Sequence, residues 1–277
     1  LWSLRSYSLD FAYCNIVTFD NVSADFSNTS YPVTNISNGS MISRWESTSA
    51  GDQYITISLT SKDIDYVAIA GHNFGDSGAD LSVECLVSAS WTEVFAPQSL
   101  SNNDPTILRF EKTICDGVRL KIGSTVTTPT ITVFYAGEIL ELQRNIYVGH
   151  TPLNYALQSD IVNGMSEEGQ FIGRVIIGER NQTSLEMQNI TPEFFRNKIK
   201  PFYDNAVTKP FFFAWRPEKY PNEVGYCWLR QDGKMQNSLS NGMVSISFPY
   251  QGLVEGKSIT TAQPTARQMT LSSANNV

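Results

Sequence analysis

The sequence predicts a mainly β chain, in which a β-sandwich precedes an α+β unit with one flanking helix. In residues 1–142, short apolar segments with strand-like alternation recur between turn residues. In residues 143–255, strands precede a helix and further strands follow it. The chain has 277 residues, of which 41% are hydrophobic and 12% aromatic. This is enough for real hydrophobic cores in one large or two ordinary domains.

The expected strands of the first unit are short. Residues 11–19 are apolar, and residues 54–59 alternate between apolar and polar side chains, the period of a half-buried strand. Residues 71–75, which contain two glycines, are expected to form a turn. The other strands are predicted at residues 65–70, 81–87, 91–95, 106–110, 117–122 and 130–135.

The second unit is predicted to contain five strands and one helix. Residues 160–170 are interpreted as a loop and residues 178–181 as a turn, with strands at 171–177 and 183–188. The last strand is expected at 243–248. The polar residues 256–277 are interpreted as a C-terminal arm, either loose or docked on a neighbouring subunit.

The helix has a clear start signal. Thr191 can accept a capping hydrogen bond, Pro192 suits the first helical position and Glu193 favours the first turn. Pro201 predicts a kink or break. Two apolar strands, at 211–215 and 224–229, are expected to follow and to pack beside the helix.

The first unit resembles the discoidin-like, galactose-binding sandwiches over about residues 35–140. The resemblance rests on Trp45, Val83-Glu84, Trp91 and the segments 52–57, 64–69 and 117–122. The segment AIAGHNFG, residues 68–75, looks like versions of this sandwich in bacteriophage tail proteins. The resemblance implies a jelly-roll sandwich, whose sugar site is absent in many members of the fold.

The second unit resembles the β-sandwich-plus-helix units of phage tail tubes, distal-tail rings and hubs. The resemblance is carried by Phe202-Tyr203 and by the segments 211–215 and 220–224. It implies a structural virion protein of a tail tip or baseplate, made in the host cytoplasm. Such a protein would form part of a homo-oligomeric ring that joins the tail tube to the host-recognition apparatus. The implied partners are tube, hub, tape-measure and fibre proteins.

No catalytic motif is found, so the chain is expected to be no enzyme and to need no cofactor or metal. Phosphate-binding, nucleophile-elbow and zinc-protease patterns are missing, and the four cysteines form no CxxC pair. Cys85 and Cys227 lie in apolar runs and are expected to be buried thiols. A net charge of -7 argues against nucleic acid as a partner. No apolar run is long enough to suggest a membrane span.

Four residues are candidate glycan contacts if the first unit binds sugar. Trp45 and Trp91 could stack on a sugar ring, with core packing as the alternative for each. His72 and Asn73 could donate hydrogen bonds from a loop, with turn chemistry as the alternative. A carbohydrate-binding module for cell-surface recognition is therefore the second hypothesis. A carbohydrate-active enzyme is the third, supported only by carboxylates that the sequence does not place.

Overall fold

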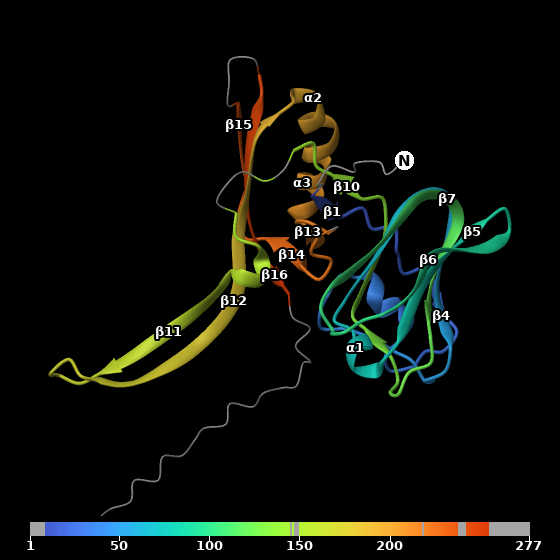
Figure 1. Cartoon of the computed structure of the whole chain (residues 1–277), viewed down its shortest axis with the longest axis horizontal. Coiled ribbons are helices and arrows are strands. Elements are labelled where there is room, and N and C mark those ends of the chain that lie inside the picture. Colours follow the sequence, from blue (N-terminus) through green and yellow to red (C-terminus); the bar gives the residue numbers. More distant parts are fainter. Residues whose placement is uncertain (1–8, 145, 147–149, 218, 238–241, 255–277) are drawn as a thin grey trace, which may run out of the picture.

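The structure is a computed structural model that describes residues 9–144, 146, 150–217, 219–237 and 242–254. It is mainly β, with one β-sandwich and one larger antiparallel sheet that carries a helix (Figure 1). The predicted fold class, mainly β with one flanking helix, is confirmed. The strands of the second unit belong to a single eight-stranded sheet. The predicted arm, residues 256–277, lies outside the described residues.

The sandwich is built on a six-stranded sheet in the order β2-β4-β7-β5-β6, with β9 also paired to β4. A two-stranded sheet of β3 and β8 completes it. The strands are β2 (Val22–Ala24), β3 (Trp45–Glu46), β4 (Gln53–Ala70), β5 (Asp80–Val87), β6 (Ser90–Ser99), β7 (Thr106–Ile122), β8 (Thr130–Ile131) and β9 (Val133–Gly137). Two short helices are η1 (Val33–Ser37) and α1 (Phe74–Ser77), and α1 begins inside the predicted turn.

β4 and β7 are each one long strand where two short strands were predicted. Their pairing is irregular between Ser58 and Lys62, and again between Ile64 and Tyr66. Residues 60–63 are polar and exposed, so the apolar pattern stops there while the backbone pairing continues past the core. The predicted segments 54–59 and 65–70 are the two ends of β4 on either side of this stretch.

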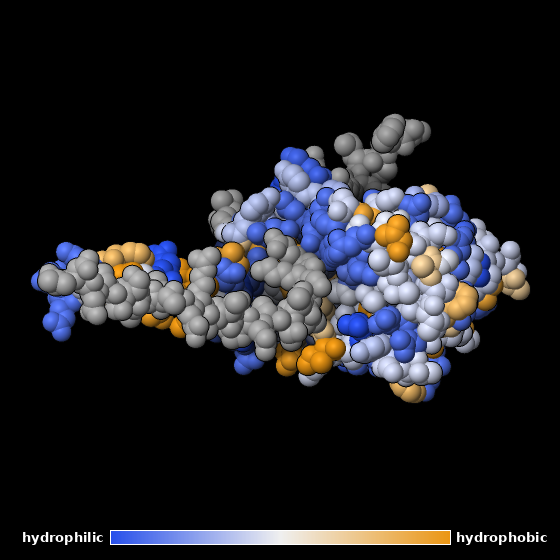
Figure 2. All heavy atoms as spheres, turned by 90° about the horizontal axis from the view of Figure 1, so that it is seen from below, coloured by the Kyte–Doolittle hydropathy of each residue, from blue (hydrophilic) through white to orange (hydrophobic). Residues whose placement is uncertain are grey.

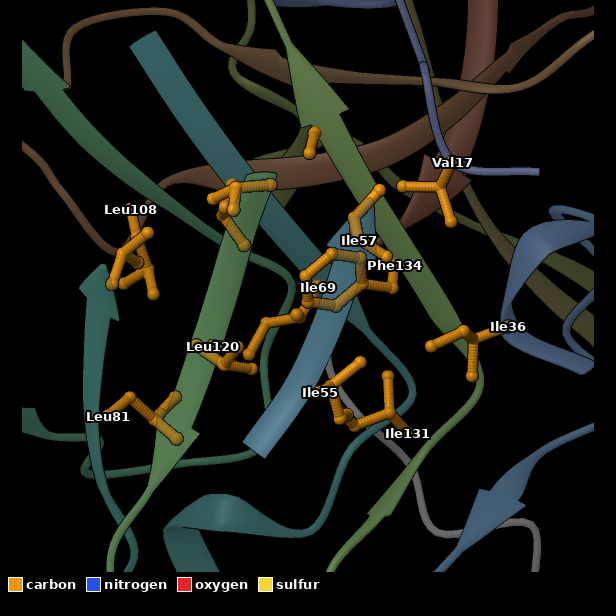
Figure 3. Packing of buried hydrophobic residues seen from close by; sticks show 14 of the residues in the cluster. Val17, Ile36, Ile55, Ile57, Ile69, Leu81, Leu108, Leu120, Ile131 and Phe134 are labelled. Carbon is orange, nitrogen blue, oxygen red and sulfur yellow. The ribbon is translucent and has the colours of Figure 1, made fainter. Parts of the chain in front are cut away.

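The core of the sandwich is mainly aliphatic. Ile55, Ile57, Ile69, Leu120 and Phe134 point into one layer between the strands (Figure 3), and none of them is exposed. Cys85 and Cys115 are also buried in this cluster, which confirms the expectation for Cys85. The alternation at residues 54–59 therefore matches the structure, with Ile55 and Ile57 buried and Ser58 exposed.

The larger sheet has the order β10-β1-β13-β14-β16-β12-β11, with β15 paired to β16. Its strands are β1 (Asp10–Ala12), β10 (Leu140–Glu141), β11 (Leu157–Met165), β12 (Phe171–Ile190), β13 (Phe211–Ala214), β14 (Val224–Leu229), β15 (Lys234–Asn237) and β16 (Val244–Leu253). The predicted strands at 211–215, 224–229 and 243–248 match β13, β14 and β16. A short helix, η2 (Leu153–Tyr155), precedes β11.

β1 and β10 come from the first 142 residues but pair within the larger sheet. The strand predicted over 11–19 is only β1, because the Asn15 side chain accepts the Val17 N–H and turns the chain out of the ladder. The division at residues 142 and 143 therefore does not separate the two sheets cleanly. That each unit folds by itself stays a prediction.

The helix lies on the larger sheet as three contiguous parts: α2 (Pro192–Phe194), η3 (Phe195–Ile199) and α3 (Lys200–Ala206). The Thr191 side chain accepts the Phe194 N–H at 3.4 Å, which confirms the predicted cap. η3 is a π-helical turn placed directly before Pro201. Proline lacks the N–H that a regular helix would bond, so the predicted break takes the form of this change in helix type.

The largest difference from the expected secondary structure is a long hairpin. Residues 160–170, interpreted as a loop, are most of β11 and the hairpin turn, and the turn predicted at 178–181 lies inside the 20-residue β12. Gly178 pairs with Asp160 in the ladder, next to a bulge between Asp160 and Ile161. The glycine therefore marks an irregularity within one strand.

A third core cluster joins the sandwich to the larger sheet. Tyr66, Ala68 and Tyr135 from the sandwich pack with Phe212 and Tyr226 from the larger sheet, and all are buried. The Tyr226 hydroxyl donates to the Gly39 carbonyl at 2.6 Å, and the Tyr135 hydroxyl donates to the Pro210 carbonyl at 3.1 Å. These contacts fix the two sheets relative to each other.

Candidate functional site

Trp45, a predicted stacking platform, is in the core of the sandwich. It is 0% exposed, and its Nε1–H donates to the Phe26 carbonyl at 3.2 Å. β3 places it opposite Ile131 of β8. A fully buried ring has no face for a sugar, so the predicted glycan contact at Trp45 is wrong and core packing describes this residue.

His72 is also buried, and both of its ring nitrogens have partners within the chain. Nε2 lies 2.9 Å from the Asp104 carbonyl, and Nδ1 accepts the Phe74 N–H at 3.3 Å. The ring stacks on Phe74. Burial lowers the pKa of His72 to about 4, so the neutral ring is the folded form. Both ring nitrogens are used within the chain, so the predicted hydrogen bond from His72 to a ligand is wrong.

Asn73 ties the same turn to the segment before β8. Its Nδ2–H donates to the Thr128 carbonyl at 3.0 Å, and its Oδ1 accepts the Thr130 N–H at 2.9 Å. Gly71, at φ +62°, precedes these residues, and a Cβ there would meet the Thr132 hydroxyl at 2.6 Å. Turn chemistry therefore accounts for the contacts of Asn73.

Trp91 is half-buried on β6, opposite Leu86. The Arg119 guanidinium lies 4.3 Å from its ring centre and 4.0 Å from that of Tyr54. β5 starts next to α1 and Leu86 is near its other end, about 20 Å away by the rise of a strand. Trp91 therefore does not join His72 and Asn73 in one site.

A cavity of about 670 Å³ lies where the sandwich meets the larger sheet. Phe95 and Phe110 contribute aromatic surface, and Gln98, Asn102 and Arg109 contribute polar groups. Arg109 is bound there by two carboxylates: Nη1 lies 2.6 Å from Asp10 Oδ2, and Nη2 pairs with Glu141. The volume is within the range of small-ligand sites.

Within the described residues, no group of three or more His, Cys, Asp or Glu side chains could hold a metal ion. No helix in that part of the chain is long and apolar enough to cross a membrane.

The most unusual surface of the protein is the β11–β12 hairpin. Eighteen large hydrophobic residues of the described chain are exposed, and nine of them lie in residues 157–180. These nine are between 42% and 71% exposed. The hairpin projects away from the rest of the sheet (Figure 1), and hydrophobic residues show along it on the left of Figure 2. The nine are Leu157, Ile161, Val162, Met165, Phe171, Ile172, Val175, Ile176 and Ile177.

Apolar side chains cover both faces of this hairpin. Ile161 pairs with Ile176 and Val162 pairs with Val175, so two neighbouring cross-strand pairs point to opposite faces. Among the described strands, β11 pairs with β12 alone, so its outer edge is open. Only residues from Asn181 onward in β12 are supported by a second neighbour, β16. Within the described residues, the projecting part is therefore a two-stranded ribbon with both faces exposed and both edges unpaired.

The sequence held a signal for this hairpin that the loop interpretation missed. Ser166 and Gly169 are turn-forming residues that lie, with Glu167 and Glu168, between two segments containing apolar residues, which is a hairpin pattern. The structure forms this turn, with the Gly169 N–H donating to the Ser166 carbonyl at 2.9 Å and the Gln170 N–H donating to Ser166 Oγ at 3.1 Å. The consecutive apolar residues on each strand hid the usual alternation.

No protein-family model matches this chain, and no curated protein matches it either. Among solved structures, chitosan-binding module 1 from a chitosanase/glucanase of Paenibacillus sp. IK-5 has 14% identity and a TM-score of 0.38, covering 45% of this chain and 98% of that chain. The family 32 carbohydrate-binding module of NanJ from C. perfringens, in complex with galactose, has 14% identity and a TM-score of 0.39, covering 46% and 98%. The family 32 carbohydrate-binding module of AlyQ, in complex with 4,5-unsaturated mannuronic acid, has 25% identity and a TM-score of 0.37. The match covers 45% of this chain and 95% of that chain. TM-scores this low carry no statement about what this chain binds.

Proposed function

We propose that this chain is a structural subunit that assembles into a homo-oligomer through the β11–β12 hairpin. The single observation that carries the proposal is the ribbon of nine exposed apolar residues, which no described strand or loop covers on either face or along the β11 edge. A two-stranded ribbon is marginal in water by itself, and an open, apolar edge strand associates readily. A partner that covers both faces would bury this surface.

The particle that the sequence resemblance implies is a phage tail tip or baseplate. The three structures described above are carbohydrate-binding modules and none is a phage protein, so this part of the proposal rests on the sequence alone. Location in the virion and contacts with tube, hub, tape-measure and fibre proteins belong to the same proposal. It includes no catalytic step. Mass spectrometry of purified virions tests the location, and absence of the chain from them would contradict it.

The assembly itself is tested by sedimentation velocity of the full chain over a wide concentration range. The wild-type chain is expected to form a species of higher mass as concentration rises. Two variants, Ile161→Thr with Ile176→Thr and Val162→Thr with Val175→Thr, each replace one apolar cross-strand pair on one face by polar side chains that are still β-branched. Both variants are expected to stay monomeric at concentrations where the wild-type chain associates.

Ile114→Thr is the matched control, because Ile114 is also an exposed β-branched residue on a strand, β7, away from the hairpin. This variant is expected to associate like the wild-type chain. Equal loss of association in the control and in the hairpin variants would contradict a specific role for the ribbon.

Glycan binding by the first unit is the second candidate, and the cavity beside Arg109 is the observation that favours it. It offers an aromatic ring, Phe95, and fixed polar groups, which are the usual components of a sugar site. Trp45 and His72 do not contribute, since both are buried.

A glycan array with the full chain tests this second candidate, and a Phe95→Ala variant tests the location. Binding that is lost in Phe95→Ala and kept in His72→Gln would support the cavity. An array without any signal would contradict glycan recognition.

A further inference from the structure

The tip of the hairpin is acidic. Glu167 and Glu168 are exposed, and neither forms an ion pair with another described residue. The hydrogen bonds of Ser166 hold the backbone of the turn that carries both side chains. Residues 157–180 carry four acidic and two basic side chains, a net charge of -2.

The helix is the basic counterpart. Residues 191–210 carry four basic and two acidic side chains, a net charge of +2 in a chain whose total is -7. Lys200 pairs with Asp204. Arg196, Lys198 and Lys209 are exposed and form no ion pair with a described carboxylate. The helix therefore presents positive charge that nothing in the described chain neutralises.

These two charged regions lie at opposite ends of one strand. β12 begins at the hairpin turn and ends at Ile190, one residue before the helix cap Thr191. Twenty residues of strand span roughly 65 Å. Figure 1 shows the tip and α2 at opposite ends of the larger sheet. The tip of one chain therefore does not reach its own helix, whereas the tip of a neighbouring copy can.

We infer that the acidic hairpin tip docks on the basic helix segment, residues 191–210, of a second copy of this chain. This inference rests on the proposed assembly and adds its direction. The apolar faces of the ribbon supply the buried area, while Glu167 and Glu168 opposite Arg196 and Lys198 set the register. A contact between two different surfaces is head-to-tail, so it forms a ring when the rotation closes and a filament when it does not.

Charge reversal tests the pairing, with association measured by sedimentation velocity at low salt. Glu167→Lys with Glu168→Lys is expected to weaken association by about tenfold or more, because like charges would then face each other. Arg196→Glu with Lys198→Glu is expected to do the same. A chain that carries all four substitutions is expected to regain association, since the pairing is restored with the signs exchanged.

The control is Asp20→Lys with Glu93→Lys. It changes the net charge of the chain by the same amount as the tip reversal, but at two exposed positions of the sandwich. This variant is expected to associate like the wild-type chain. If the four-fold variant is as weak as each pair alone, or if the tip and helix reversals leave association unchanged, the docking is overturned. In that case loss of association in the Val162→Thr, Val175→Thr variant still supports the assembly. A wild-type chain that stays monomeric at every concentration contradicts both the docking and the proposed assembly.

Discussion

Two apolar regions of this chain have opposite surroundings. At the junction of the two sheets, Tyr66, Tyr135, Phe212 and Tyr226 are buried against one another. On the β11–β12 hairpin, nine apolar side chains lie in solvent. Both regions carry enough hydrophobic surface for a specific interface, but only the first has its partner within the described chain.

The two regions also differ in the kind of side chain they use. The junction is aromatic, and the hydroxyls of Tyr66, Tyr135 and Tyr226 each donate to a backbone carbonyl. The hairpin is mainly aliphatic and β-branched, which favours a flat surface without fixed polar partners. The junction thus fixes one arrangement of the two sheets within the chain. The hairpin provides apolar surface for association, and in our proposal the charges at its tip set the orientation of the second copy.

Truncating the centre of the junction is expected to have the largest effect on stability. Phe212→Ala removes a fully buried ring between Tyr135 and Tyr226, and the cavity left behind should cost about 3–5 kcal/mol of unfolding free energy. Urea unfolding of the single chain measures this. A cost below about 1 kcal/mol would show that the junction is loosely packed and would remove the contrast with the hairpin.

Mild acid is expected to destabilise the sandwich through its buried histidine, His72. The hairpin contains no histidine and lacks this effect. Burial holds the pKa of His72 at about 4, below the ordinary histidine value of 6.5, so the unfolded chain takes up the proton first. Stability from the neutral ring is complete above pH 6.5 and is lost as pH falls toward 4. The loss approaches about 3 kcal/mol, at 1.36 kcal/mol per pKa unit.

His72→Gln is the comparison for this measurement, since it removes the titration and leaves the other histidine, His150, in place. The unfolding free energies of the two chains should diverge in pH dependence between pH 6.5 and 4. Parallel curves over this range would show that His72 is solvated in the folded protein.

A single hydroxyl at the junction is expected to have a smaller effect. Tyr226→Phe keeps the ring but removes the donor to the Gly39 carbonyl, which should cost about 1 kcal/mol. Thermal or urea unfolding measures the difference, with Tyr31→Phe, an exposed tyrosine, as the matched control. An equal effect at both positions would argue against the hydrogen bond between the units.

The smallest effect on the stability of the single chain is expected on the hairpin. Val175→Thr replaces an exposed side chain and should change the unfolding free energy by no more than about 0.5 kcal/mol. Measured at a concentration where the chain is single, a loss above 1 kcal/mol would show that the ribbon is already covered within the chain.

Most of the fold could be predicted from the sequence because its signals are local. The alternation at 54–59, the cap at Thr191 and the aromatic runs at 211–215 and 224–229 each identified an element. The long strands could not be predicted in full, since their polar middles and Gly178 look like turns until a neighbouring strand pairs with them. Pairing partners distant in sequence, such as β1 with β13, leave no local pattern.

The candidate site was less predictable than the fold. Trp45 and His72 have the side chains of a sugar site, but their burial is decided by strands and loops distant in sequence, such as β8 and the segment around Asp104. The hairpin was missed for the opposite reason. Its consecutive apolar residues resemble no half-buried strand, because neither face is covered within the described chain.

The central claim is that the hairpin is bare in the single chain and covered in an assembly, whereas the junction is covered in both. Hydrogen–deuterium exchange at low and high chain concentration tests it directly. Amides of residues 157–180 are expected to exchange quickly at low chain concentration and to become protected as the chain associates. Amides of residues 133–137 and 211–214 are expected to stay protected at both concentrations. Protection of 157–180 that is already complete in the single chain, or that does not change when the mass rises, would contradict the claim.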